Sequence, residues 1–469
     1  MSKNSELNEK LSYKNENAYS KCTEKEKKEI IEFCEGYKSF INIAKTEREF
    51  CESAAIKLAK AGFVPFETKK KLKAGDKIYT VNRNKGIMAV VVGKDDIKNG
   101  VNIVGAHIDS PRLDLKPNPL YEDSGIAYFK THYYGGIKKY QWTTIPLAIH
   151  GVAALSDGTQ IKIVIGESDD DPVFCVSDLL PHLASTQMSK KASEVVLGES
   201  LNVILGHIGC DDKDIKEGVK FNILNILYKK YDICEEDLIS SEIEVVPAFK
   251  ARDIGFDRSI SGGYGQDDRV CAYTALEAIL DIKKPNKTSV CLLVDKEEVG
   301  SMGATGMQSR YFENILAKIC NALTDDYNDI VLRDCISNST CLSADVGAAY
   351  DPNYGEVYEK RNSPVFGGGI FLSKYTGARG KGGASDASAE LVARIRKIFN
   401  DNNVKWQIGE LGKVDEGGGG TIAQYVANLD MDVLDAGTAL MSMHSPYELS
   451  SKFDVFMTYK AYREFFVNA

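Results

Sequence analysis

The first part of the chain places apolar and polar residues at helical spacing. Between Glu24 and Ala61 apolar residues return every three or four positions, which predicts two amphipathic helices. Two short apolar runs follow, at 86–94 and at 101–109, and turn-forming or charged residues bound them. Runs of this length in this setting are typical of buried strands.

The middle of the chain, from about residue 111 to 240, has a different pattern. Tyrosine- and threonine-rich segments alternate there with turn residues, which indicates a mainly β module. After this module, apolar strand patterns alternate with amphipathic helical patterns up to the C-terminus. We therefore expect an α/β domain with a largely parallel sheet, formed by residues 1–110 and 241–469, with an inserted β-rich domain at 111–240.

The composition is that of an ordinary globular protein. Of 469 residues, 43% are hydrophobic and 27% are charged, which excludes wholesale disorder. The net charge is −9 and no long basic run occurs, so neither a nucleic acid nor a membrane is an expected partner. No apolar stretch approaches the ~18–20 residues of a membrane span. The polar N-terminus also lacks the apolar core of a secretory signal.

The cysteines indicate the compartment. There are eleven of them, an odd number, and no two form a CxxC pair. This usage is typical of free thiols in a reducing environment rather than of a disulfide framework or a zinc ribbon. The sequence therefore predicts a soluble cytoplasmic enzyme.

The first candidate site residues lie at the end of the predicted strand at 101–109. His107 and Asp109 are two positions apart, so an extended backbone places both side chains on one face. A histidine with a carboxylate at this spacing can bind a metal ion while the carboxylate orients its ring. The alternative interpretation is a histidine that is only hydrogen-bonded at a strand end.

Two pairs of adjacent acidic residues follow. Asp267 and Asp268 precede a predicted helix, where either could cap the first turn. Glu297 and Glu298 end an apolar strand pattern, and burying two carboxylates there is costly without a cation. At the carboxyl end of a strand one carboxylate can bind a metal ion while its neighbour acts as a general base.

Asp345 and His444 also follow apolar strand patterns. Together with the groups above they give more imidazole and carboxylate donors than one tetrahedral zinc ion with an open position requires. The set fits two metal ions roughly 3.5–4 Å apart that share a bridging carboxylate. No GxSxG elbow or P-loop occurs, and the four glycines at 417–420 lack the phosphate-loop pattern.

Five motifs occur in one order along the chain: GAHIDSPRLD, GQDDRVCA, DKEEVGS, SADVGAAYDPNY and MHSPYE. In this order they resemble the M18 metallopeptidases, the group of aspartyl aminopeptidase and aminopeptidase I. The likeness runs from about residue 35 to the C-terminus. It implies a phosphopeptidase-like α/β sandwich with an inserted β domain, and an activity that releases N-terminal amino acids from peptides.

The resemblance also implies roles for the candidate residues. His107, Asp267 and Asp345 resemble the ligands of one metal ion. Asp267, as the bridging residue, resembles a ligand of a second ion together with Glu298 and His444. The ions expected are two zinc ions per subunit, with cobalt or manganese as active substitutes.

The remaining roles follow from the same resemblance. Glu297 resembles the general base, and Asp109 resembles the residue that orients His107. The peptide bond between Asp267 and Asp268 is expected to be cis.

The resemblance extends to assembly and specificity. It implies a homo-oligomer, a tetrahedral dodecamer in which the inserted domain makes contacts between subunits. A histidine of one subunit approaches the site of another in similar enzymes, and His150 is the candidate here. The stretch that contains Lys374 looks like the bacterial aminopeptidase 1 branch. Lys374 either meets an acidic group of the substrate or is a solvated loop cation.

Two other functions remain open. One is a deacylase of N-acylated amino acids, which would use the same metal chemistry but need a blocked amine. The other is a non-catalytic assembly protein that keeps its metals for structure. The unliganded carboxylate expected at Glu297 argues against the second, because a structural site has no use for a free base.

Overall fold

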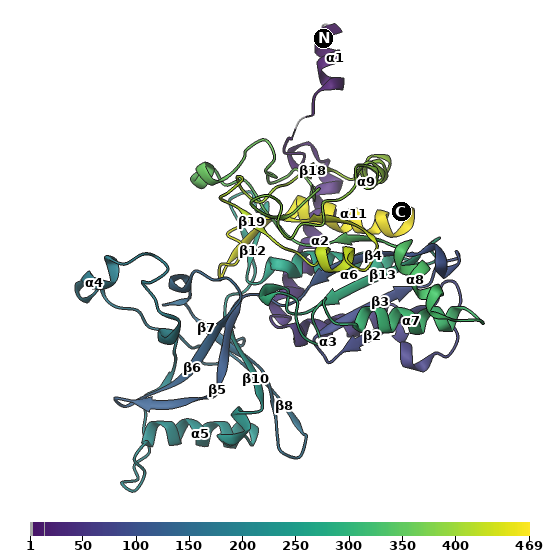
Figure 1. Ribbon diagram of the computed structural model, residues 1–469. Coiled ribbons are helices and arrows are strands. Elements are labelled where there is room, and N and C mark those ends of the chain that lie inside the picture. Colours follow the sequence, from purple (N-terminus) through teal and green to yellow (C-terminus); the bar gives the residue numbers. More distant parts are fainter. Residues whose placement is uncertain (1–2, 14) are drawn as a thin grey trace.

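The computed structural model describes residues 3–13 and 15–469, and it divides into two lobes (Figure 1). The larger lobe contains a nine-stranded sheet with strand order β1-β2-β3-β13-β4-β14-β20-β16-β18. These strands are β1 (Val64–Pro65), β2 (Lys77–Asn82), β3 (Gly86–Val91), β13 (Thr288–Val294), β4 (Val101–His107), β14 (Thr340–Ser343), β20 (Asp432–Gly437), β16 (Ile370–Ser373) and β18 (Trp406–Ile408).

The sheet is mixed, with a parallel centre. Strands β13, β4, β14 and β20 run parallel to one another, whereas β3 and β16 pair antiparallel on either side of them. The four carboxyl ends therefore meet at one edge, which is where sites gather in sheets of this kind. The pairs β1–β2 and β16–β18 are parallel as well, so five of the eight strand pairs agree with the expectation of a largely parallel sheet.

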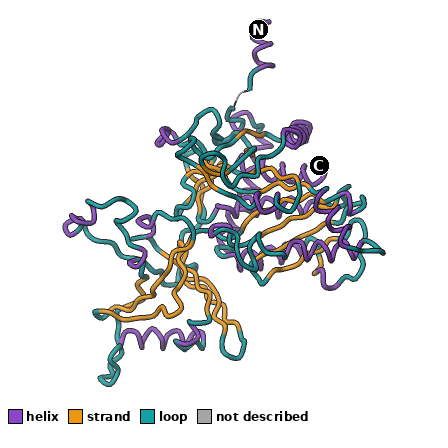
Figure 2. Tube along the Cα trace, viewed as in Figure 1, coloured by secondary structure: helices purple, strands orange, loops and turns teal. Residues whose placement is uncertain are grey.

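Helices cover both faces of this sheet (Figure 2). Alternate residues of β4 enter two separate cores: Val104 and Ala106 pack on one side, Val101 and Ile103 on the other. This alternation follows from the two-residue repeat of a strand. The first side is covered by α2 (Glu24–Ile43), α3 (Glu47–Lys60), α6 (Gln266–Asp281), α9 (Ala389–Asp401) and α11 (Lys452–Asn468). The second is covered by α7 (Tyr311–Leu323), α8 (Asp329–Ser337) and α10 (Ala423–Ala427).

The two N-terminal helices match their predicted pattern. Helices α2 and α3 each begin with a capping box, formed by Thr23 with Glu26 and by Thr46 with Glu49. Each box satisfies backbone N–H groups that the first helical turn leaves free. The short helix α1 (Lys3–Leu11) stands away from the rest of the chain in Figure 1 and buries none of its residues.

The smaller lobe contains a six-stranded antiparallel sheet with strand order β8-β7-β10-β5-β6-β9. We call it the inserted sheet. Its strands are β5 (Arg112–Asp123), β6 (Ile126–Tyr134), β7 (Leu147–Ala154), β8 (Gln160–Ile165), β9 (Val203–Gly206) and β10 (Ser241–Pro247). Helix α5 (Gly218–Tyr231) packs against it, α4 (Ser185–Met188) lies in a long connection, and the lobe has its own core around Trp142.

The chain also forms a third, five-stranded sheet. It is formed by β11 (Arg252–Ile254), β12 (Ile260–Gly263), β22 (Glu448–Ser451), β21 (Ala439–Met441) and β15 (Gly347–Ala348). A two-stranded ribbon joins β17 (Gly377–Ala378) to β19 (Gly418–Gly419). Across the described ranges, the helices are all too short or too polar to cross a membrane.

The apolar segment before His444 is divided between two sheets. The apolar segment at 437–445 does not form a single strand, because the chain leaves the large sheet after β20 and enters the five-stranded sheet at β21. Gly437 lies at the crossing, and a Cβ atom there would come to 1.8 Å from the carbonyl oxygen of Asp345. Only glycine permits this approach, which brings the two segments together beside the site.

Candidate metal centre

The candidate residues converge at the carboxyl edge of the large sheet. His107 ends β4, and Asp345 lies two residues after β14. Glu297 and Glu298 follow β13 in a single 3-10 turn, Glu297–Val299. This turn removes the strict alternation of a strand, so both carboxylates can face the same space.

Three of these groups form a buried cluster. His107 Nε2 lies 3.2 Å from Asp267 Oδ1 and 3.8 Å from Asp345 Oδ1. One donor atom from each of the three residues lies within 4.8 Å of the others, and all three side chains are buried. One imidazole nitrogen and two carboxylate oxygens at this spacing can surround one ion.

A second cluster shares Asp267 with the first. His444 Nε2 lies 3.1 Å from Asp267 Oδ2 and 3.6 Å from Glu298 Oε2. These three donors also lie within 4.8 Å of one another. Asp267 therefore directs one oxygen to each cluster, which is the arrangement of a bridging carboxylate.

The charges of the two clusters fit cations. Burial is the main cause that raises the pKa of Glu298 and of Asp345 well above the usual range. Glu298 Oε1 is buried and has no hydrogen-bond partner among the described residues. Buried carboxylates without partners are costly unless a cation compensates them. Histidine nitrogen with carboxylate oxygen is also the donor set that zinc accepts.

Glu297 lies beside both clusters and belongs to neither. Its Oε2 is 3.8 Å from His107 Nε2, and its side chain lines the cavity in front of the clusters. Burial, helped by the charges of Asp267 and Asp109, raises the pKa of Glu297 to about 7. A free carboxylate in this position can exchange a proton with a molecule held between the clusters.

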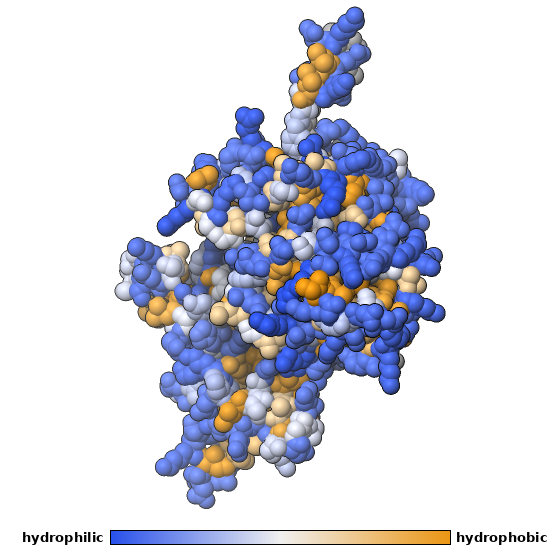
Figure 3. Space-filling model, turned by 45° about the vertical axis from the view of Figure 1, so that its right-hand side comes forward, coloured by the Kyte–Doolittle hydropathy of each residue, from blue (hydrophilic) through white to orange (hydrophobic). Residues whose placement is uncertain are grey.

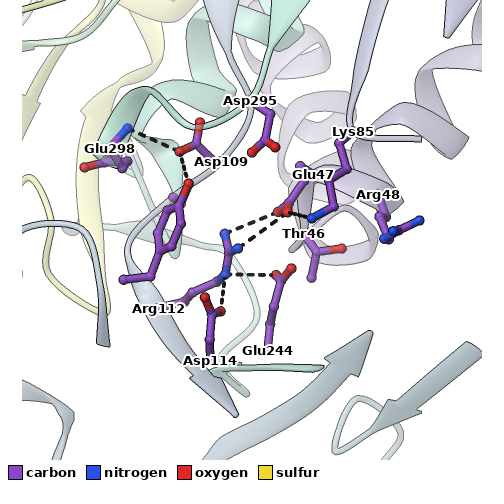
Figure 4. A network of polar contacts seen from close by, with 12 residues as sticks. Thr46, Glu47, Arg48, Lys85, Asp109, Arg112, Asp114, Glu244, Asp295 and Glu298 are labelled. Atoms are coloured by element: carbon purple, nitrogen blue, oxygen red, sulfur yellow. Dashed lines mark hydrogen bonds and ion pairs between the residues drawn. The ribbon is translucent and has the colours of Figure 1, made fainter. Parts of the chain in front are cut away.

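Asp109 is fully buried and organises this edge of the sheet. It accepts hydrogen bonds from the backbone N–H groups of Glu297 and Glu298, both at 3.2 Å. Its Oδ1 lies 3.3 Å from His107 Nδ1, which also faces the Asp109 carbonyl oxygen at 3.0 Å. Figure 4 shows Asp109 next to Glu298. The position of Asp109 fits the orienting role expected for it.

Two supporting residues were missed in the sequence. Glu448 of β22 accepts the backbone N–H groups of Gln266 at 2.6 Å, Asp267 at 3.1 Å and His444 at 2.8 Å. Ser110 donates its hydroxyl proton to the carbonyl oxygen of Asp267 at 2.6 Å. Ser110 lies in the motif GAHIDSPRLD, and Glu448 is the last residue of MHSPYE. Their place in these motifs was the signal in the sequence that could have identified them. The peptide bond between Asp267 and Asp268 is cis, as expected.

A cavity of about 610 Å³ opens in front of the clusters. Its walls combine the metal-cluster carboxylates with a glycine-rich loop and several charged side chains. Besides Glu297, the charged residues outside the clusters are Arg379, Lys381, Glu410, Lys413 and Asp435.

Two predicted substrate residues lie elsewhere. Lys374 does not line this cavity and instead forms an ion pair with Asp386 at 2.9 Å. Its neighbour Lys381 pairs with the same aspartate at 3.0 Å and does line the cavity. The sequence could not choose between them, because the path of this loop decides which cation faces the site.

His150 is not brought to the centre either. His150 belongs to β7 of the inserted sheet, and its ring is buried, with Nδ1 2.8 Å from Glu49 and Nε2 2.9 Å from Glu167. Both ring nitrogens are therefore occupied at the junction of the two lobes. Within one chain His150 therefore supports the contact between the lobes, and its approach to the site of another subunit stays a prediction.

Comparisons with known proteins agree with the fold and the motifs. The family described as aminopeptidase I zinc metalloprotease (M18) matches residues 40–466. A probable M18 family aminopeptidase 1 from Clostridium acetobutylicum is 54% identical over 457 residues, which are 96% of this chain and 98% of that protein. The crystal structure of an M18 family aminopeptidase from Thermotoga maritima has a TM-score of 0.94 at 48% identity, covering 98% of this chain and 100% of that chain.

The crystal structure of aminopeptidase I from Clostridium acetobutylicum has a TM-score of 0.90 at 49% identity, covering 98% of this chain and 100% of that chain. These matches confirm the family resemblance and the mixed α/β fold class expected from the sequence. The chain belongs to the M18 family of zinc metallo-aminopeptidases.

Proposed function

We propose that the centre holds two zinc ions and removes the N-terminal residue of a peptide. His107, Asp267 and Asp345 would hold one ion, and Asp267, Glu298 and His444 the other. The observation that carries the proposal is the position of Asp267, whose two carboxylate oxygens each lie close to a different histidine. Cobalt and manganese accept the same donors and are expected to substitute for zinc.

Bound metal ions of this kind polarise the scissile carbonyl group and lower the pKa of a water molecule toward neutrality. The protein supplies the proton transfer. Glu297 is the general base, because its carboxylate lies 3.8 Å from His107 Nε2, lines the cavity and is a member of neither cluster. It takes a proton from the attacking water and delivers it to the leaving amine.

Two buried carboxylates, Asp109 and Glu448, hold these groups in place. Asp109 fixes the turn that carries Glu297 and Glu298 through two backbone hydrogen bonds. Glu448 fixes the backbone of Asp267 and His444 in the same way. Preorganised groups of this kind lose little freedom during the reaction, which is how a rigid site favours the transition state.

A paired assay tests the proposed reaction. Zinc- or cobalt-loaded protein is offered aminoacyl amides with a free amine, and each is run beside its N-acetylated form. Turnover of the free-amine series alone supports an aminopeptidase, whereas turnover of the acetylated series alone would identify a deacylase. Turnover of neither, with both ions bound, would favour a non-catalytic assembly protein. Metal-stripped protein is the control, and its activity should return when zinc is added.

We also propose that the chain assembles into a homo-oligomer through the smaller lobe. Leu179, Leu183, Met188 and Ile208 lie in this lobe and expose more than half of their surface. Figure 3 shows apolar patches on the same lobe. The S. cerevisiae mApe1 dodecamer shares the fold, with a TM-score of 0.75 at 22% identity. Light scattering on the purified protein would separate a dodecamer from smaller species.

We further propose that the protein is located in the cytoplasm. All eleven cysteines are free thiols, and proteins of oxidising compartments usually pair theirs.

A further inference from the structure

The end of β6 in the inserted sheet and the residues after it contact the second metal cluster and Asp109, the residue that orients His107. Tyr134, the last residue of β6, donates its hydroxyl proton to Asp109 Oδ2 at 2.7 Å. Two residues later, the carbonyl oxygen of Gly136 accepts a hydrogen bond from His444 Nδ1 at 2.8 Å. A short stretch of the smaller lobe thus contacts Asp109, which orients one histidine, and directly contacts the other.

Contacts at Nδ1 determine which ring nitrogen of each histidine carries the proton. A ring nitrogen that faces an oxygen acceptor carries the proton, which leaves the other nitrogen free to bind a metal ion. His444 Nδ1 faces the Gly136 carbonyl, so its Nε2 is the free nitrogen, and this atom points at Asp267. His107 Nδ1 faces Asp109, so its Nε2 is free in the same way.

The position of Tyr134 is set by a buried charge network. Arg112 of β5 is its direct partner across the sheet, and the Arg112 guanidinium lies 4.0 Å from the centre of the Tyr134 ring. Arg112 itself contacts Asp114 at 2.7 Å, Glu47 of α3 at 3.3 Å and Glu244 of β10 at 3.4 Å. Figure 4 shows Arg112 between these three carboxylates. Glu47 belongs to the larger lobe, so the network ties Tyr134 to both lobes.

The glycines after Tyr134 are needed for this geometry. Gly135 has a φ of +73°, a conformation that favours glycine, and a Cβ atom there would lie 3.2 Å from Glu298 Oε2. Any larger residue would strain the turn and crowd a candidate ligand of the second cluster. The turn therefore reaches the second cluster on two sides, at Glu298 and at His444.

We propose that Tyr134, Gly135 and Gly136 are positioning residues of the metal centre, so that the inserted sheet supplies part of the support for both histidines. The inference rests on the proposed two-metal site. It implies that the centre reaches its full metal affinity only when the smaller lobe is docked against the larger one. The three residues act through Asp109, Glu298 and His444.

Cobalt titration of the metal-free full chain tests the inference without an activity assay. The two binding constants are measured by competition with a chelator, and the visible spectrum of bound cobalt reports the geometry around it. We expect Tyr134→Phe to weaken cobalt binding by about 10-fold, the low end of the effect of losing a direct partner of a ligating histidine, because Tyr134 acts on His107 through Asp109. Gly135→Ala should also weaken binding and should shift the cobalt spectrum.

Tyr133→Phe is the matched control, because Tyr133 precedes Tyr134 on the same strand and its side chain is exposed. It should bind cobalt like the wild type. Thermal melting of the metal-free proteins separates positioning from folding: a merely structural role for Tyr134 would lower the melting temperature and leave both cobalt constants unchanged.

Equal cobalt constants for Tyr134→Phe, Tyr133→Phe and the wild type would overturn the inference. Failure of the proposed function gives a different result, in which the wild type itself binds fewer than two ions. In that case the effect of Tyr134→Phe on the ion that does bind still decides whether the inserted sheet supports the centre.

Discussion

The carboxylate of Glu448 accepts the backbone N–H of Asp267 at 3.1 Å, and its other oxygen accepts the backbone N–H of His444 at 2.8 Å. One buried side chain thus joins the residue shared by the two clusters to a histidine almost 180 positions later in the chain. A carboxylate suits this place because it only accepts hydrogen bonds, and every partner here is a donor.

Replacing Glu448 tests this relationship. We expect Glu448→Gln to lower the free energy of unfolding of the metal-free protein by about 1–3 kcal/mol, because the amide nitrogen cannot accept and leaves a buried N–H unpaired. Urea unfolding measures the change. The exposed Glu194→Gln is the control and should unfold like the wild type. Equal midpoints for all three proteins would show that Glu448 does not hold this backbone.

The variant Glu297→Gln tests whether Glu297 acts as the general base rather than as a metal ligand. The amide keeps the shape of the side chain but cannot take a proton, so we expect kcat to fall by about 10²–10⁴-fold. Metal content, measured by elemental analysis, should stay at the wild-type value because Glu297 belongs to neither cluster. Near wild-type turnover would remove Glu297 from the mechanism.

Because Asp267 belongs to both clusters, variants of the ligands should differ in how many metal ions they bind. Asp267→Asn should reduce the binding of both ions, because each cluster loses a charged oxygen. His444→Ala and Asp345→Asn should each weaken mainly one ion, since each residue belongs to one cluster. Equilibrium dialysis against zinc gives the number of ions per chain. An unchanged stoichiometry for Asp267→Asn would contradict a shared site.

The two lysines of one loop should differ in function. Lys381 lines the cavity whereas Lys374 does not, although both pair with Asp386. We expect Lys381→Ala to raise KM severalfold for substrates with an acidic N-terminal residue, and Lys374→Ala to leave KM within about twofold. Substrates with N-terminal leucine are the comparison. The reverse order of the two variants would mean that the loop takes another path when substrate is bound.

We expect the contribution of His150 to the free energy of unfolding to depend on pH. Burial alone lowers its pKa, but the hydrogen bonds to Glu167 and Glu49 outweigh burial, so the pKa of His150 is raised in the folded chain. A histidine with a raised pKa contributes its full stabilisation below its unfolded value of about 6.5. This contribution is lost as the pH rises through the folded value.

Urea unfolding of His150→Gln and of the wild type at several pH values measures this contribution. We expect a deficit of about 1–3 kcal/mol for the variant at pH 6, because charged hydrogen bonds are lost. The deficit should shrink as the pH rises above about 6.5. A deficit that is constant across this range would show that the ring stays in one protonation state.

Much of the site could be predicted from the sequence because its donors stand at the ends of apolar runs. His107 and the pair at Glu297 and Glu298 follow strands whose composition alone predicts burial. The parallel strands of one α/β sheet end at a common edge, so their terminal polar groups are expected to meet. The identity of the family followed from five motifs in one order, and the comparisons confirm it.

Other features depended on tertiary structure. The contacts of Tyr134 with Asp109 and of Gly136 with His444 join segments of different lobes, and no local pattern encodes how two lobes dock. The placements of Lys374 and His150 were decided in the same way, by the path of a loop and by the closure of an interface. Sequence determined which chemical groups this protein has at its strand ends, because periodicity and composition are local. Apart from Asp109, which is two residues from His107, the fold decided which groups support them, because Tyr134, Gly136 and Glu448 are distant in the chain from the residues they contact.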